Sequence, residues 1–173
     1  MTFRQRPKPG RDKAGLAVSE DPSVRAQSDA LRLLSYRPRS RAELLKRLAD
    51  KGHDRATAEA AVDKLASAGL VDDGRVARMM ASAKAASAGL GRVRIAQELR
   101  RRGFAERTVS EAMSGLSPED ELSAAETLLL RRLAKMPGLA ADKRRARLYG
   151  LLRRRGFGEG LIFKLFDKHL KVE

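Results

Sequence analysis

The spacing of apolar residues changes near Ser28. From there to the end of the chain, apolar residues recur three or four positions apart, and the apolar–polar alternation typical of strands is absent. Residues 1–27 hold three of the six prolines and scattered basic residues but no apolar stripe. The pattern therefore predicts an all-α protein that is preceded by a disordered basic tail over residues 1–27.

The predicted helix ends are marked by capping residues. Ser40 followed by Glu43 predicts a capping box, in which the serine accepts a bond from an early helical N–H and the glutamate reaches back to the N–H of Ser40. Gly52 ends that helix. The other predicted starts and stops are Asp54 to Gly69, Asp72 or Asp73 to about Gly89, and Ser117 to the residues before Pro137.

A pattern of helix, glycine and helix occurs three times, around Gly52, Gly103 and Gly156, which are 51 and 53 residues apart. Apolar residues stand eight and four positions before each glycine, and further matches follow directly after it and ten positions after it. These sets are Leu44, Ile95, Leu148; Leu48, Leu99, Leu152; His53, Phe104, Phe157; and Val62, Met113, Phe166. With one helix leading into each copy, the sequence predicts three tandem three-helix repeats over residues 28–71, 72–117 and 118–173.

The stretch RRRGF occurs twice, at residues 100–104 and 153–157. A left-handed glycine at a helix end brings the next residue against the residue three before the end, which predicts contacts of Phe104 with Leu99 and of Phe157 with Leu152. One arginine of each triplet complements the negative end of the helix dipole. The remaining arginines need another explanation.

The chain carries 37 Lys and Arg against 22 Asp and Glu, a net charge of +15. Such a surplus favours a polyanion or an acidic protein surface, bound without sequence specificity. Helical phase places Arg144, Arg147 and Arg154 on one predicted outward stripe. The candidate binding residues are Arg92, Arg94, Arg100, Arg101, Arg102, Arg144, Arg145, Arg147, Arg153, Arg154 and Arg155.

Several other classes of function find little support in the sequence. The chain has no cysteine, two histidines without neighbouring ligands, and no complete dinucleotide or P-loop motif, so we expect neither metal nor cofactor. The pair Asp72-Asp73 could act in acid–base chemistry, although capping explains it better. With no catalytic constellation and no membrane-length apolar run, we expect a monomeric, cytoplasmic protein that is not an enzyme. A helix-turn-helix factor is disfavoured because the arginines lie toward helix C-termini.

Four motifs together resemble the RecX family of recombination regulators. They are the block from Ala30 to Leu44 (ALRLLSYRPRSRAEL), the block from Gly69 to Arg75 (GLVDDGR), Glu98-Leu99 with Gly103, and Leu148-Tyr149 with Leu152 and Arg155-Gly156-Phe157. The resemblance spans residues 28 to 170. The resemblance implies a structural role for eight residues of these motifs: Arg37, Ser40, Glu43, Asp72, Asp73, Arg75, Gly103 and Gly156.

The resemblance implies a fold of three three-helix repeats in an elongated, curved arrangement. It also implies a non-enzymatic regulator, usually an inhibitor, that lodges in the groove of the RecA filament on DNA and depresses strand exchange, ATPase and coprotease activity during DNA repair, recombination and the SOS response. The expected partners are the RecA filament and, weakly, single- and double-stranded DNA. The alternative is a non-specific DNA-binding or architectural protein that acts by competing for DNA.

Overall fold

The computed structural model describes residues 21–170, so most of the predicted tail, residues 1–20, and the last three residues lie outside the described chain. Within residues 21–170 the chain forms nine helices and no strand, which confirms the all-α prediction. The helices are α1 (Pro22–Tyr36), α2 (Arg41–Asp50), α3 (Arg55–Ser67), α4 (Asp73–Ala88), α5 (Arg92–Arg101), α6 (Glu106–Ser114), α7 (Pro118–Leu133), α8 (Ala141–Arg155) and α9 (Glu159–His169).

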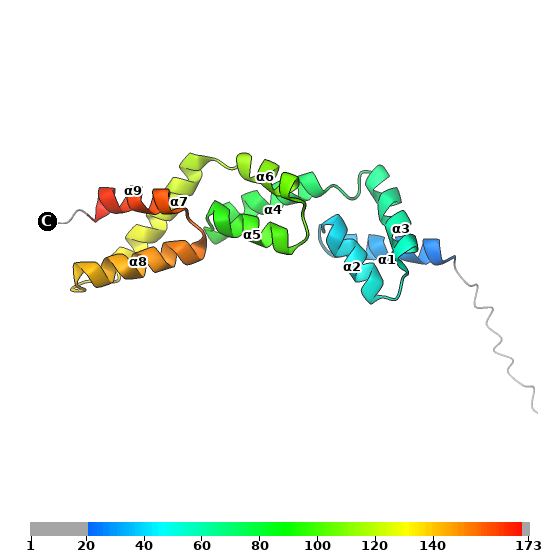
Figure 1. Cartoon of the computed structure of the whole chain (residues 1–173), viewed down its shortest axis with the longest axis horizontal. Coiled ribbons are helices and arrows are strands. Elements are labelled where there is room, and N and C mark those ends of the chain that lie inside the picture. The colour runs from blue at the N-terminus through cyan, green and yellow to red at the C-terminus, as the bar shows by residue number, and fades with distance from the viewer. Residues whose placement is uncertain (1–20, 171–173) are drawn as a thin grey trace, which may run out of the picture.

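The helices form three groups that follow one another along an elongated molecule (Figure 1), with α1–α3 at one end, α4–α6 in the middle and α7–α9 at the other end. Each group has a hydrophobic core of its own. The residues eight and four positions before the three aligned glycines are fully buried in these cores: Leu44, Ile95, Leu148, Leu48, Leu99 and Leu152. The three tandem three-helix repeats are therefore confirmed.

The first helix begins earlier than predicted. Asp21 caps α1 by accepting a bond from the N–H of Ser23, and Pro22 occupies the first turn, where its missing N–H costs nothing. Ala26 is fully buried on the same face as Ala30. The prediction of a disordered segment is thus wrong for residues 22–27, because small alanines form the buried stripe where we looked for larger apolar residues.

Most of the predicted caps are confirmed, since Asp54, Asp72 and Ser117 each accept a bond from the backbone N–H three residues ahead. The capping box at Ser40 is only half right. Ser40 accepts from the N–H of Glu43 at 3.1 Å, but the Glu43 carboxylate binds the guanidinium groups of Arg37 and Arg39 and not the N–H of Ser40. Two charged donors attract this carboxylate more strongly than one neutral N–H.

The three aligned glycines end their helices in the predicted left-handed conformation, with φ of +87°, +81° and +86° for Gly52, Gly103 and Gly156. The residue after each glycine donates its backbone N–H to the carbonyl of the leucine four positions before the glycine, which recurs in all three repeats. These bonds are 3.1 Å from His53 to Leu48, 3.3 Å from Phe104 to Leu99 and 3.1 Å from Phe157 to Leu152. The glycine-phenylalanine half of RRRGF is therefore a helix stop.

Candidate interface between the repeats

The helix stop of one repeat docks on the start of the middle helix in the preceding repeat. Ser40, the N-cap of α2, is 1% exposed and donates its hydroxyl to the carbonyl of Arg102 at 2.6 Å. Gly91, the N-cap of α5, donates its N–H to the carbonyl of Arg155 at 2.9 Å. The third arginine of each triplet thus has a structural role through its backbone carbonyl, which accepts from the N-cap residue in both junctions, from a side-chain hydroxyl in the first and from a backbone N–H in the second.

Glycine is required at these junctions for a second reason besides its left-handed φ. A Cβ atom on Gly103 would lie 2.5 Å from the Cβ of Ala42, and a Cβ on Gly156 would lie 2.8 Å from the Cα of Arg94 and closer still to its N and Cβ. A Cβ on Gly52, the stop of the first repeat, which docks on no preceding repeat, would have no neighbour within 4 Å. The close approach of adjacent repeats therefore depends on Gly103 and Gly156.

Asp73 also belongs to a junction, and not to the cap of its own helix. Asp72 caps α4 by accepting from the N–H of Arg75 at 2.9 Å. Asp73 instead accepts from the N–H of Arg41 at 2.8 Å, at the first turn of α2. Of the two predicted caps, Asp72 is therefore the one that caps α4. Both aspartates have structural roles, Asp72 as a helix cap and Asp73 as a contact between repeats.

Each junction opens into a basic cleft. The first cleft, of about 440 Å³, lies between α2 and the end of α5 and is lined by Arg37, Ala42, Glu43, Lys46, Arg47, Asp50, Arg101, Arg102 and Gly103. The second cleft, of about 700 Å³, lies between α5 and the end of α8 and is lined by Leu90, Val93, Arg94, Gln97, Glu98, Arg153, Arg154, Arg155, Gly156 and Phe157. The structure thus brings much of both arginine triplets to corresponding places.

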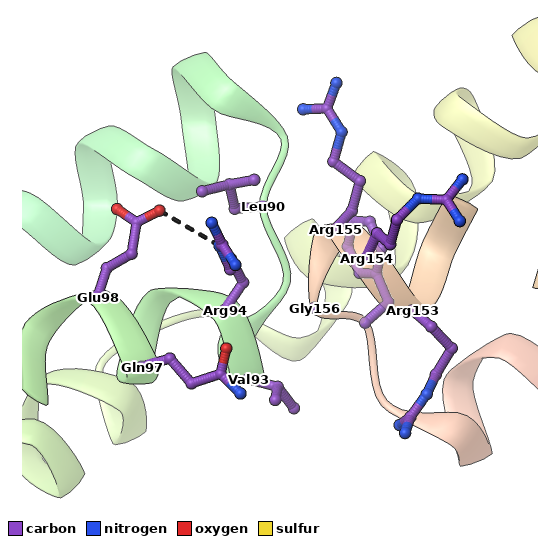
Figure 2. A pocket seen from close by; sticks show the side chains of 10 residues that line it. Leu90, Val93, Arg94, Gln97, Glu98, Arg153, Arg154, Arg155 and Gly156 are labelled. Carbon is purple, nitrogen blue, oxygen red and sulfur yellow. Dashed lines mark ion pairs between the residues drawn. The ribbon is translucent and has the colours of Figure 1, made fainter. Parts of the chain in front are cut away.

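In the second cleft the three arginine side chains of the triplet splay apart from the end of α8, opposite Arg94 on α5 (Figure 2). Arg155 donates to the carbonyl of Ala88 at 2.8 Å, and Arg153 lies 3.4 Å from the carboxylate of Glu159. Arg154 is exposed and has no ion pair within residues 21–170. Its charge is therefore the most available one in this cleft.

The carboxylate of the second cleft is balanced from within the protein. Lys84 binds Glu98 at 2.5 Å, and this hydrogen bond lowers the pKa of Glu98, with the charge of Arg94 contributing from 3.5 Å. Glu98 is consequently ionised near neutral pH. Because Lys84 and Arg94 share one carboxylate, the cleft keeps a positive surplus.

In the first cleft, burial raises the pKa of Glu43, but hydrogen bonds and charge from Arg37 and Arg39 outweigh this effect and lower it. Arg47 lies 3.9 Å from Asp50, a weak exposed pair. Lys46 and Arg101 are exposed and have no ion pair among the described residues. Two cations of this cleft are therefore available to a ligand.

Three further predicted binding arginines have internal partners besides Arg94, Arg153 and Arg155. Arg92 binds Glu121 at 2.9 Å and donates to the carbonyls of Met113 and Leu116, which ties α5 to the start of α7. Arg100 makes a two-bond ion pair with Glu106 at 2.7 and 2.6 Å. Arg145 lies over the ring of Phe166, 5.1 Å from its centroid. The donors of Arg92 are therefore used within the protein, between α5 and the start of α7, and are not available at the candidate surface.

The predicted outward stripe of the third repeat is only partly present. Arg147 and Arg154 are exposed, whereas Arg144 is half-buried, and its Nε atom is buried without a hydrogen-bond partner in the described chain. Arg144 therefore faces outward only in part, and its role in binding stays a prediction.

The sequence prediction missed Lys46 and Arg47, which line the first cleft. The repeat pattern could have indicated them. They lie six and five positions before Gly52, on α2, and the RRRGF stop of the next repeat packs against this helix. The remaining motif residue, Arg75, lies 3.5 Å from the carbonyl of Gly69 and stays at the start of α4. Both histidines bind single carboxylates, His53 with Asp29 at 2.9 Å and His169 with Glu126 at 2.5 Å.

Residues 21–170 contain no group of three side chains able to hold a metal ion, and none of their helices has the length and apolarity to cross a bilayer. The candidate site is therefore defined by charge and shape. Its two clefts are built from helix stops, which is why sequence motifs at those stops point to them.

Family models match each of the three repeats: RecX, first three-helix domain, over residues 26–65; RecX, second three-helix domain, over 72–113; and RecX, third three-helix domain, over 119–166. The chain belongs to the RecX family. It is 40% identical to the regulatory protein RecX of Thermobifida fusca (strain YX), over 95% of this chain and 90% of the relative. It is 33% identical to the regulatory protein RecX of Streptomyces coelicolor, over 88% of this chain and 81% of that relative.

The fold agrees with solved structures of the RecX family. The crystal structure of RecX from Lactobacillus salivarius matches with a TM-score of 0.81 at 18% identity, covering 86% of this chain and 96% of that one. A second crystal structure of regulatory protein RecX matches with a TM-score of 0.79 at 23% identity, covering 86% and 75%. Membership in the RecX family supports a regulatory role connected with RecA and an action that is not enzymatic.

Proposed function

We propose that this RecX-family protein acts as a cytoplasmic monomer that binds in the groove of the RecA filament on DNA and lowers its strand exchange, ATPase and coprotease activities. The observation that carries the proposal is the pair of basic clefts at successive repeat junctions. A regulator of an extended filament needs contact points spread along its length. The elongated row of repeats supplies them (Figure 1).

Charge supports a partner with a negative surface. The net charge is +15, and Arg101, Arg147 and Arg154 are exposed without ion pairs in the part of the chain that the structure describes. Attraction of this kind speeds encounter with an acidic partner and weakens as salt is added. Contact with DNA phosphates would add affinity without sequence specificity.

The test is the ATPase rate of RecA filaments preassembled on single-stranded DNA, titrated with the protein from far below to above the recombinase concentration. We expect inhibition at strongly substoichiometric amounts, at a salt concentration where the protein alone scarcely binds DNA. Inhibition that requires enough protein to coat the DNA would contradict filament binding.

Charge-reversal variants test the site. The variant Arg101→Glu, Arg147→Glu, Arg154→Glu should lose inhibition while its helix content, measured by circular dichroism, stays unchanged. Arg101 and Arg154 line the clefts, and Arg147 is an exposed candidate on α8. The matched control reverses three exposed arginines that are not among the candidate binding residues, Arg25, Arg55 and Arg107, with the same change in net charge. Equal loss in both triple variants would show that net charge alone matters.

The second candidate function is competition for DNA by a non-specific DNA-binding protein, which the net charge of +15 favours. Under this alternative, inhibition follows the fraction of DNA covered. It also falls with salt as steeply as binding of the protein to bare DNA does.

A further inference from the structure

We propose that the two clefts are equivalent sites for the same acidic segment of the partner, so that one chain binds two protomers of the recombinase through corresponding contacts. This inference rests on the proposed function and adds to it the number of sites, their residues and the chemistry of the ligand. It follows from the way the repeats dock.

The two clefts have the same construction. In each, the wall is the helix stop of the following repeat and the floor is the exposed side of the middle helix of the preceding one. The corresponding wall residues are Arg101 and Arg154, Arg102 and Arg155, and Gly103 and Gly156, while the corresponding floor residues are Ala42 and Val93, Glu43 and Arg94, Lys46 and Gln97, and Arg47 and Glu98. In both, the N-cap residue donates to the carbonyl of the third arginine, through the hydroxyl of Ser40 in the first and the N–H of Gly91 in the second.

The net charge of the two clefts is the same, although the corresponding floor residues Glu43 and Arg94, and Arg47 and Glu98, are opposite in sign. Five cations and two carboxylates line the first, and four cations and one carboxylate line the second, so each has a surplus of three positive charges. Arg101 and Arg154 occupy the same position in their repeats, and both guanidinium groups are exposed without an ion pair within the described residues. Each cleft therefore presents one free guanidinium at a corresponding point.

The lining favours an acidic protein segment over nucleic acid. Surfaces that bind DNA are much more positively charged than those that bind proteins. Here the arginines share their clefts with Glu43, Asp50 and Glu98, and the second cleft adds an apolar contact at Val93, which is 46% exposed. A free guanidinium matches a carboxylate through two parallel hydrogen bonds.

Two equivalent sites on one chain imply avidity. Once the first cleft is occupied on a filament, the second meets its segment on another protomer at a high effective concentration. Linking two binding events in this way raises overall affinity by about 10²–10⁴-fold. Loss of either cleft should therefore remove the whole increase in affinity.

The first experiment measures stoichiometry by calorimetry, with recombinase protomers that are prevented from assembling and with no DNA present. We expect two protomers per chain for the unaltered protein, one for Arg101→Glu, one for Arg154→Glu and none for the double variant. Arg107→Glu, an exposed reversal outside both clefts, is the control and should still bind two. A stoichiometry of one for the unaltered protein would overturn the proposal.

The second experiment uses filaments. Either single variant should bind them at least about 10²-fold more weakly, in line with the loss of avidity, whereas Arg107→Glu should not. If the unaltered protein binds filaments and the single variants bind equally well, the equivalent clefts are refuted while the proposed function stands. If the unaltered protein does not bind filaments, the proposed function itself fails.

Binding to bare single-stranded DNA distinguishes the source of the negative charge. An acidic protein segment predicts that Arg101→Glu and Arg154→Glu change DNA affinity no more than Arg107→Glu does. A parallel loss of DNA and filament binding would assign the clefts to phosphates and overturn this inference.

Discussion

Replacing Gly156 by alanine should destabilise the protein far more than the same change at Gly52. Both glycines end the second helix of a repeat with nearly the same φ, +86° and +87°. They differ in what surrounds them, because a Cβ on Gly156 would meet the backbone of Arg94, whereas a Cβ on Gly52 would meet nothing within 4 Å. The pair therefore separates the cost of backbone conformation from the cost of repeat docking.

The magnitudes follow from these surroundings. An alanine in the left-handed region costs about 1–2 kcal/mol, which is partly offset by about 0.4–1 kcal/mol from the reduced entropy of the unfolded chain. Gly52→Ala should thus lower the free energy of unfolding by about 1 kcal/mol. Gly156→Ala adds the cost of overpacking, about 1–3 kcal/mol, because the backbone of Arg94 cannot turn aside as a flexible side chain would.

The assay is urea unfolding followed by circular dichroism at 222 nm. For a denaturant slope near 2 kcal/mol per M, an extra 2 kcal/mol shifts the midpoint of Gly156→Ala by about 1 M relative to Gly52→Ala. Gly138→Ala is a control within the third repeat, since Gly138 also has positive φ, +72°, and open space around it. Equal destabilisation by the Gly138 and Gly156 substitutions would refute the claim that adjacent repeats pack on this glycine.

Two further predictions concern single side chains. Ser40→Ala should lower the free energy of unfolding by about 2 kcal/mol, since it removes the cap of α2 and also the donor to the Arg102 carbonyl. Ser117→Ala removes a cap and an exposed hydrogen bond to the Glu119 carboxylate, with no contact between repeats, and should cost about 1 kcal/mol. Similar losses in urea unfolding would contradict the junction role of Ser40. Hydrogen bonds from Lys51 and His53 lower the pKa of Asp29, so its stabilising effect is full above the ordinary Asp pKa and disappears as pH falls through the lowered value. The stability gap between the unaltered protein and Asp29→Asn should therefore be present at pH 5 and shrink as the pH falls below about 4, the ordinary Asp pKa, and a gap that persists at pH 2 would argue against this ion pair.

Much of the fold was readable from local signals. The glycine stops, the caps at Asp54 and Ser117 and the threefold repeat all depend on contacts within a few residues, so the sequence predicts them directly. The start of α1 was missed because its buried residues, Ala26 and Ala30, are small. The hydrogen-bond partner of the Glu43 carboxylate was predicted wrongly, because Arg37 and Arg39 compete with the N–H of Ser40 for it. The result of that competition depends on where the arginine side chains lie.

The candidate site was predicted in composition but not in arrangement. Both arginine triplets were found, yet sequence could not separate Arg92 and Arg100, which bind Glu121 and Glu106, from the free Arg101 and Arg154. Ion pairing between elements depends on side-chain geometry, which helical phase alone does not specify. Lys46 and Arg47 belong to the site only because the end of α5 in the next repeat docks beside them, and that contact lies beyond the reach of local sequence patterns.

By itself, the sequence determined that this is a basic, all-helical chain of three repeats with a glycine stop in each, because helix periodicity, capping and net charge are local or additive properties. Only the tertiary structure decided that the stop of one repeat seats on the N-cap of the middle helix in the preceding repeat, and that two clefts of similar charge result. Those contacts join residues about 60 positions apart, Ser40 with Arg102 and Gly91 with Arg155, and their partners are chosen by the shape of packed helices.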